Sequence, residues 1–144
     1  MEIELFVRLI VPDNIAITAK NTLLKLGFSI SGLRRSDYYR LECDDDVVED
    51  YIKDALSKVD ILANANKHRV SFIKDNEGIN ILVTDIGDAC TGILNTLRER
   101  LGFKGIKAME KGTVWTFIGC NQEDAVKMTK ELLANENYQE FKVI

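Results

Sequence analysis

Apolar and polar residues alternate along the first eleven residues with the period of a β-strand. The odd positions are apolar, and they are Ile3, Leu5, Val7, Leu9 and Val11. A period of two predicts a strand with one buried face. The charged residues of this stretch occupy even positions together with Phe6. We therefore expect the second face of this strand to be partly covered as well.

A helical period follows the strand. The side-chain oxygen of Asp13 or Asn14 can accept the free backbone N–H groups of a first helical turn. Apolar residues then recur at helical spacing as far as Leu26. Gly27 is expected to end the helix, because glycine adopts the left-handed conformation without a Cβ clash.

The rest of the first half supplies two further strands, a helix and a last strand. Residues 30–43 are interpreted as a hairpin that turns at Ser36-Asp37. A second amphipathic helix over residues 48–62 follows three aspartates, Asp44, Asp45 and Asp46, whose carboxylates favour the positive end of a helix dipole. With a strand over residues 68–73, the predicted order is β-α-β-β-α-β.

The same order is predicted again after the polar residues 74–78, where we place a boundary. It comprises a strand over 79–83, a helix over 89–101, a hairpin over 105–120 turning near Lys111-Gly112, a helix over 122–133 and a strand over 141–144. Two short echoes support a repeat. Leu26-Gly27-Phe28 recurs as Leu101-Gly102-Phe103, and Ile61-Leu62-Ala63-Asn64 recurs as Leu132-Leu133-Ala134-Asn135.

The predicted fold class is α+β, with two tandem ferredoxin-like β-α-β-β-α-β repeats over residues 1–75 and 76–144. Each repeat would form a four-stranded antiparallel sheet with both helices on one face. The other face of each sheet needs a cover. We expect the two bare faces to pack on each other, which would make the monomer an internal pseudo-dimer.

Composition narrows the function classes. The chain of 144 residues has a net charge of −4, shared evenly by the two halves, so neither half is a basic nucleic-acid-binding module. No run of about 18 apolar residues is present, and we predict no membrane span and no signal peptide. Cys43, Cys90 and Cys120 are far apart in the sequence, which is typical of reduced thiols in a cytoplasmic protein.

The end of the second half carries a family resemblance. Residues 128–138 read Met-Thr-Lys-Glu-Leu-Leu-Ala-Asn-Glu-Asn-Tyr, and Phe-Lys-Val follows at 141–143. This resembles the C-terminus of the PurS family, the small subunit of formylglycinamide ribonucleotide amidotransferase, where a helix closes with Lys-Leu-Leu-Ala-Asn before a final strand. The helix end Leu-Gly-Phe and the following Gly32-Leu33-Arg34 and Gly105-Ile106-Lys107 are similar to the family as well. PurS proteins are single units of about half this length that associate, and their Asp-Pro-x-Gly entry to the first helix is absent here.

The resemblance implies an accessory role. PurS proteins have no active site of their own; they bridge the glutaminase and synthetase subunits and help ammonia pass between them. By resemblance, the partners are these two subunits of a phosphoribosylformylglycinamidine synthase, in purine biosynthesis, with self-association as a further option. The alternative is a small-molecule-sensing domain of ACT type, which shares the strand–helix order and binds amino acids at the position occupied here by residues 87–92.

No catalytic, cofactor-binding or metal-binding residue is predicted. Cys90 is expected to be an ordinary buried cysteine, His68 a solvent-facing residue, and Asp44, Asp45 and Asp46 a solvated helix start. The candidate partner interface comprises Arg34, Arg35, Tyr38, Tyr39, Arg40 and Trp115, because Arg and aromatic residues are enriched where proteins meet. Ordinary charges on an edge hairpin would explain the arginine and tyrosine cluster equally well. For Trp115, the favoured interpretation is a core residue or filler between the repeats.

Overall fold

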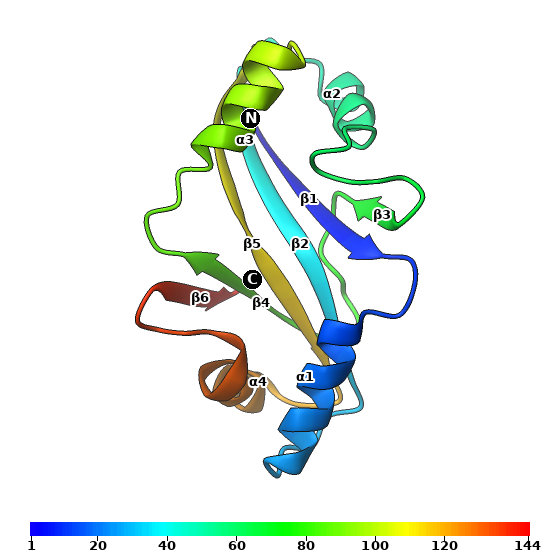
Figure 1. Ribbon diagram of the computed structural model, residues 1–144, viewed down its shortest axis with the longest axis vertical. Helices are drawn as coiled ribbons and strands as arrows, with labels where there is room; N and C mark the ends of the chain where they lie inside the picture. The colour runs from blue at the N-terminus through cyan, green and yellow to red at the C-terminus, as the bar shows by residue number, and fades with distance from the viewer.

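The computed structural model describes residues 1–144, in which six strands and four helices form an α+β fold (Figure 1). The strands are β1 (Glu2–Leu9), β2 (Gly32–Cys43), β3 (His68–Ser71), β4 (Ile79–Asp85), β5 (Ile106–Ile118) and β6 (Gln139–Val143). The helices are α1 (Asn14–Lys25), α2 (Glu49–Leu56), α3 (Thr91–Asn95) and α4 (Gln122–Met128). The π-helical turns η1 (Thr96–Arg100) and η2 (Thr129–Leu133) extend α3 and α4. None of the helices is both long and apolar enough to cross a bilayer.

All six strands belong to one antiparallel sheet in the order β3-β1-β2-β5-β4-β6. The prediction of two four-stranded sheets was therefore wrong. Both expected hairpins are absent, because β2 and β5 run without interruption through the predicted turns. Asp37 lies opposite Thr113, and Tyr38 lies opposite Gly112. The backbone groups at these positions find partners on the neighbouring long strand, so no local turn is needed to satisfy them.

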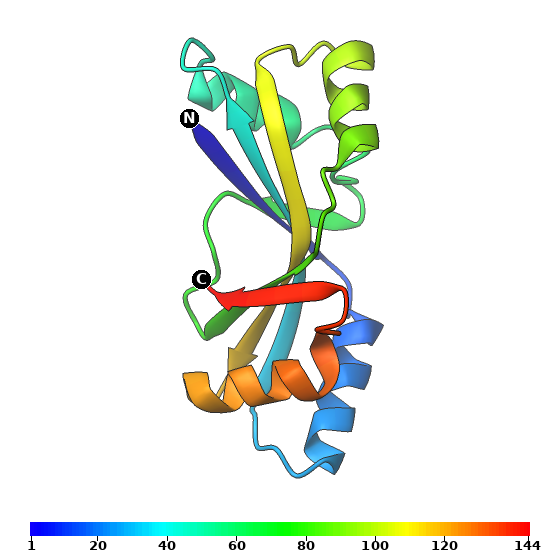
Figure 2. The ribbon, with the colours of Figure 1, turned by 90° about the vertical axis from the view of Figure 1, so that its left-hand side faces the viewer.

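The two halves join edge to edge through β2 and β5, and the predicted face-to-face packing of two sheets was also wrong. The strand order reads the same from either edge, which relates the halves by a local two-fold axis between the long strands. Ile3 of β1 and Ile79 of β4, 76 positions apart, begin matching apolar patterns. Figure 2 shows the long strands extending along most of the molecule.

The repeated Leu-Ala-Asn stretch forms the same turn in both halves. The Asn64 side chain accepts the backbone N–H of Asn66 at 2.9 Å, and the Asn135 side chain accepts that of Asn137 at 3.0 Å. The backbone N–H groups of the two asparagines donate in turn to the side chains of His68 and Gln139, each at 2.9 Å. This asparagine turn leads the chain into β3 and into β6, which gives the echo a structural reason.

Both hydrophobic cores lie on the same face of the sheet, and each takes helices from both halves. One core packs α2 with α3 and η1 over one end of the long strands, around Leu41 and Leu97. The other packs α1 with α4 over the opposite end, around Trp115 and Phe117. Figure 1 shows the two helix pairs at opposite ends. The expectation that the helices share one face is confirmed, but the cores are interlocked rather than one per repeat.

Local signals were mostly correct at helix ends. Asp13 caps α1, and Gly27 and Gly102 have positive φ after α1 and η1. The second helix of the first half is shorter than expected: α2 begins at Glu49, so Asp44, Asp45 and Asp46 lie in the preceding turn and not in its first turn. Leu26, expected on the buried stripe of α1, is 54% exposed.

Candidate functional site

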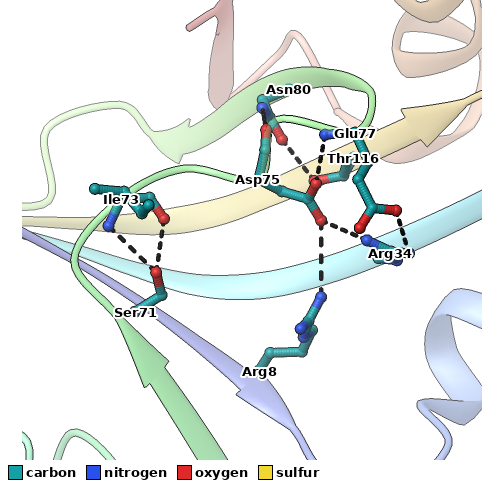
Figure 3. Close-up of polar contacts among 8 residues, drawn as sticks. All are labelled: Arg8, Arg34, Ser71, Ile73, Asp75, Glu77, Asn80 and Thr116. Atoms are coloured by element: carbon teal, nitrogen blue, oxygen red, sulfur yellow. Dashed lines mark hydrogen bonds and ion pairs between the residues drawn. The ribbon is translucent and has the colours of Figure 1, made fainter.

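The segment 74–78 crosses the sheet face that carries no helices (Figure 3). It has to cross, because β3 lies at one edge of the sheet and β4 is next to the other edge. Asp75 anchors it. The guanidinium of Arg34 donates to the Asp75 carboxylate at 2.7 Å, and that of Arg8 lies 3.7 Å from the same oxygen. The residues that sequence patterns suggested as a boundary therefore serve as a partial cover for the sheet.

The environment of Asp75 favours its charged form. Partial burial raises the pKa of the Asp75 carboxyl, but the backbone N–H of Glu77 and the guanidinium of Arg34 stabilise the carboxylate. Together with the charge of Arg8, they outweigh the burial and hold its pKa below the usual value. Asp75 is thus ionised at neutral pH and ties segment 74–78 to Arg34.

Two neighbouring contacts fix the end of the same segment. Asn80, which is buried, donates to the Asp75 carbonyl and accepts the hydroxyl hydrogen of Thr116 at 2.6 Å. Gly78 passes so close to β5 that a Cβ atom there would overlap the carbonyl oxygen of Phe117. The segment is held by side-chain ion pairs at Asp75 and by close backbone contact at Gly78.

Basic side chains gather where β1 ends and β3 begins, beside the N-terminal part of β2. A hollow of about 550 Å³ lies here between the β1–α1 connection, the start of α1 and the N-terminal part of β2, and a second hollow of about 260 Å³ adjoins it under segment 74–78. Arg8, Arg34, Arg69 and Glu77 line both. We call the larger one the arginine hollow. It is the most site-like feature of the molecule, because cationic side chains and an apolar wall meet in a concave surface.

The predicted interface residues of the first half lie on both faces of β2, since neighbouring side chains on a strand point to opposite faces. Arg34, Tyr38 and Arg40 lie on the face crossed by segment 74–78, whereas Arg35 and Tyr39 lie on the helix-covered face. They do not form one surface. Only Arg34 belongs to the arginine cluster on its face.

Most of these side chains already have partners within the chain. Arg40 donates to Glu110 at 2.8 Å, and the buried Tyr38 hydroxyl donates to Glu4 at 2.8 Å. Burial, together with the Glu4 carboxylate, raises the pKa of Tyr38 well above its usual value. Tyr38 packs edge-on against Phe6 in a small cluster on the helix-free face. These residues thus act within the sheet.

Trp115 lies on the helix-covered face, is only 7% exposed and packs in the core shared by α1 and α4. The favoured interpretation, filler between the halves, is correct. Part of its surface nevertheless lines a groove of about 490 Å³ between α1 and η2, with Ile15, Leu132 and Leu133. This apolar groove is formed by both halves of the chain.

Cys90 and His68 both lie in environments typical of residues that stabilise the fold. Cys90 is 5% exposed, as expected, and burial raises the pKa of its thiol. His68 is half-buried rather than solvent-facing, and its Nδ1 accepts the Asn64 N–H. The structure contains no group of three or more His, Cys, Asp or Glu side chains arranged to hold a metal ion.

The loop around Gly87 borders a smaller hollow of about 280 Å³, lined by Asp85, Asp88, Lys111 and Thr113 among others. Lys111 lies 3.9 Å from Asp88. The pair of Lys111 and Asp88 is the two-fold counterpart of the pair in the arginine hollow, where Arg35 binds Asp13. The two ends of the sheet thus have the same backbone arrangement and differ in the charged side chains that they carry there.

Sequence patterns did not single out Arg8, Arg69, Asp75 or Glu77. A signal was present in Arg8, which occupies an even position of the first strand, on the face that was expected to be only partly covered. Arg69 becomes its neighbour only through the pairing of β3 with β1, which places the two arginines directly opposite each other. No local pattern contains that pairing.

Asp13→Ala is expected to lower the free energy of unfolding by about 1 kcal/mol, the usual cost of losing a helix N-cap. The Asp13 carboxylate accepts the backbone N–H groups of Ile15 and Ala16 and also binds Arg35 at 2.9 Å. Urea unfolding would measure the change. The counterpart Asp88→Ala should cost less, since Asp88 accepts only the Cys90 N–H and its contact with Lys111 is long, at 3.9 Å. Equal losses would contradict this account of Asp13.

Compared with models of known protein families and with curated protein sequences, the chain matches none.

Proposed function

We propose that the protein is a non-catalytic, PurS-like accessory subunit that bridges a synthetase and a glutaminase of a formylglycinamide ribonucleotide amidotransferase complex. The observation that carries the proposal is the joining of two matching halves through β2 and β5. PurS proteins are half-length units that associate, and a single chain of this form would present two such units in a permanent arrangement. The motif that carries the resemblance forms the same asparagine turn in each half.

The apolar groove between α1 and η2 supports a docking role. Ile15 is 56% exposed and Leu132 is 40% exposed, on helical segments from different halves. Exposed apolar surface of this kind marks places where other proteins bind. We assign the groove to the contact with one of the two large subunits.

Co-purification tests the proposal. The protein is expected to form a complex with a synthetase and a glutaminase during size-exclusion chromatography at micromolar concentration. Ile15→Ser with Leu132→Ser should weaken that complex, because it removes apolar area from the groove. Tyr51→Ser with Ile86→Ser, at exposed apolar residues elsewhere, is the matched control and should leave it unchanged. Absence of any complex would refute the accessory role.

Ligand sensing of the ACT type is the second candidate, and the hollow beside Gly87 is the observation that favours it. Its lining includes Lys111 and several carboxylates, which suit the carboxylate and amino groups of an amino acid. A ligand that binds only the folded protein raises its melting temperature. A rise with free amino acids that Lys111→Gln abolishes would favour sensing; no rise is expected from an accessory subunit.

A further inference from the structure

The arginine hollow has an excess of positive charge in an acidic protein. Its lining and that of the adjoining hollow together contain five basic side chains, Arg8, Arg34, Arg35, Arg69 and Lys74. The same linings contain three carboxylates, Asp13, Asp75 and Glu77. The whole chain has a net charge of −4, so this local excess runs against the overall charge.

The carboxylates do not neutralise all the arginines. Arg35 is held by Asp13 at 2.9 Å, and Arg34 is held by Asp75 and Glu77. Arg8 has only the 3.7 Å contact with Asp75, and Arg69 is exposed and forms no ion pair. Arg8 and Arg69 lie directly opposite each other on β1 and β3, a like-charge pair that weakens strand pairing.

The second half shows that the framework does not require these arginines. The cross-strand pair at the matching position of β4 and β6 is Thr84 and Glu140. The two-fold axis also exchanges Arg34 with Glu110, 76 positions later. The hollow at that end has three aspartates, Asp37, Asp85 and Asp88, and a single basic side chain, Lys111, in its lining. Three positions that carry arginine at one end of the sheet therefore carry neutral or acidic residues at the other end.

Size and lining indicate a ligand larger than a bare ion. A volume of about 550 Å³ lies within the range of small-molecule sites, about 300–1,000 Å³. Leu9, Val11 and Ile17 form an apolar wall beside the guanidinium groups. At the start of α1, the N–H groups of Ile15 and Ala16 are already accepted by Asp13.

We propose that the arginine hollow binds an organic phosphate monoester, with the phosphate on Arg8 and Arg69 and the organic group on the apolar wall. A phosphate dianion matches two guanidinium groups that lack a full partner, and guanidinium forks suit its oxygens. Arg34, already paired with Asp75, fixes the floor of the site. The proposal does not depend on the accessory role and holds for the isolated chain.

Calorimetric titration tests it with three probes: phenyl phosphate, inorganic phosphate and benzoate. Low salt is needed, because at 0.1 M the screening length is only about 10 Å. Phenyl phosphate should bind most tightly, since only it offers both a dianion and an apolar body. Arg8→Gln with Arg69→Gln should weaken its binding at least about tenfold. Arg69→Gln alone, at an exposed side chain, should weaken it as well and preserves the fold.

The matched control is Lys25→Gln with Lys142→Gln, which removes two positive charges from exposed positions outside the hollow. It should change the affinity by less than about twofold, since isolated surface charges contribute little. Equal weakening by the control would overturn the site in favour of general charge attraction. The proposal also fails if phenyl phosphate does not bind the wild type, or if benzoate binds as tightly as phenyl phosphate.

Discussion

Replacing Phe117 with alanine is expected to lower the free energy of unfolding by about 3–5 kcal/mol, the usual range for deleting a buried aromatic side chain. Phe117 is fully buried and lies opposite Leu33 of β2 and Ile79 of β4. Its core combines α1 of the first half with α4 of the second. The cavity would therefore loosen the contact between the halves as well as one strand. Urea unfolding followed by circular dichroism would measure the change.

The same experiment tests whether the halves unfold together. The chain has a single tryptophan, Trp115, in the core that contains Phe117. Its fluorescence and the circular dichroism signal should change in one common transition, in the wild type and in the variant. Tyr138→Ala, at an aromatic residue that is 59% exposed, is the control and should cost less than about 0.5 kcal/mol. Two separate transitions would show that the interlocked cores do not couple the halves.

Asp75→Asn is expected to lower the free energy of unfolding at neutral pH by about 2 kcal/mol, the scale of a hydrogen bond to a charged group. The substitution keeps the size of the side chain but removes the charge that holds Arg34 at 2.7 Å. The segment across the sheet would lose its ionic anchor. Glu77→Gln is the matched control: it alters the same guanidinium at a carboxylate that is 62% exposed and should cost less than about 0.5 kcal/mol.

The effect of Asp75→Asn should disappear in acid. The pKa of Asp75 is lower in the folded protein than in the unfolded chain, so its contribution is fully present above the unfolded value of about 3.9. That contribution is lost as the pH falls through the lower folded value. Unfolding curves recorded from neutral pH downwards should therefore show the difference between wild type and variant shrinking as Asp75 becomes protonated. A difference that persists in acid would assign the loss to packing instead of charge.

The fate of the predicted hairpins explains how much of the fold could be predicted. The interpretation of residues 30–43 as a hairpin correctly indicated β-structure in residues 32–43. The sequence could not distinguish a hairpin from one long strand, because both have the same period of two. Lys111-Gly112 suggested a turn, yet Gly112 is extended and packs closely against the Val83 carbonyl of β4. The presence of a neighbouring strand, not the glycine, decided the conformation.

The candidate site shows the same limit. Arg34 was singled out as part of a sequence cluster of arginines and tyrosines, although neighbouring members of that cluster lie on opposite faces of the sheet. Its true neighbours, Arg8 and Asp75, are 26 and 41 positions away and meet it through strand order and through the path of segment 74–78. Charge attraction between them depends on a few ångströms of separation, and sequence distance carries no information about that separation.

The sequence by itself determined the features that depend on neighbouring residues: the period of each element, the cap at Asp13, the glycine ends of α1 and η1, and the asparagine turns before β3 and β6. Only the tertiary structure decided that the halves share one sheet and that each core takes helices from both halves. It also decided that segment 74–78 covers part of the helix-free face. Local features follow from steric limits and hydrogen bonds within a few residues. Strand pairing and charge clustering follow from partners that only the folded chain brings together.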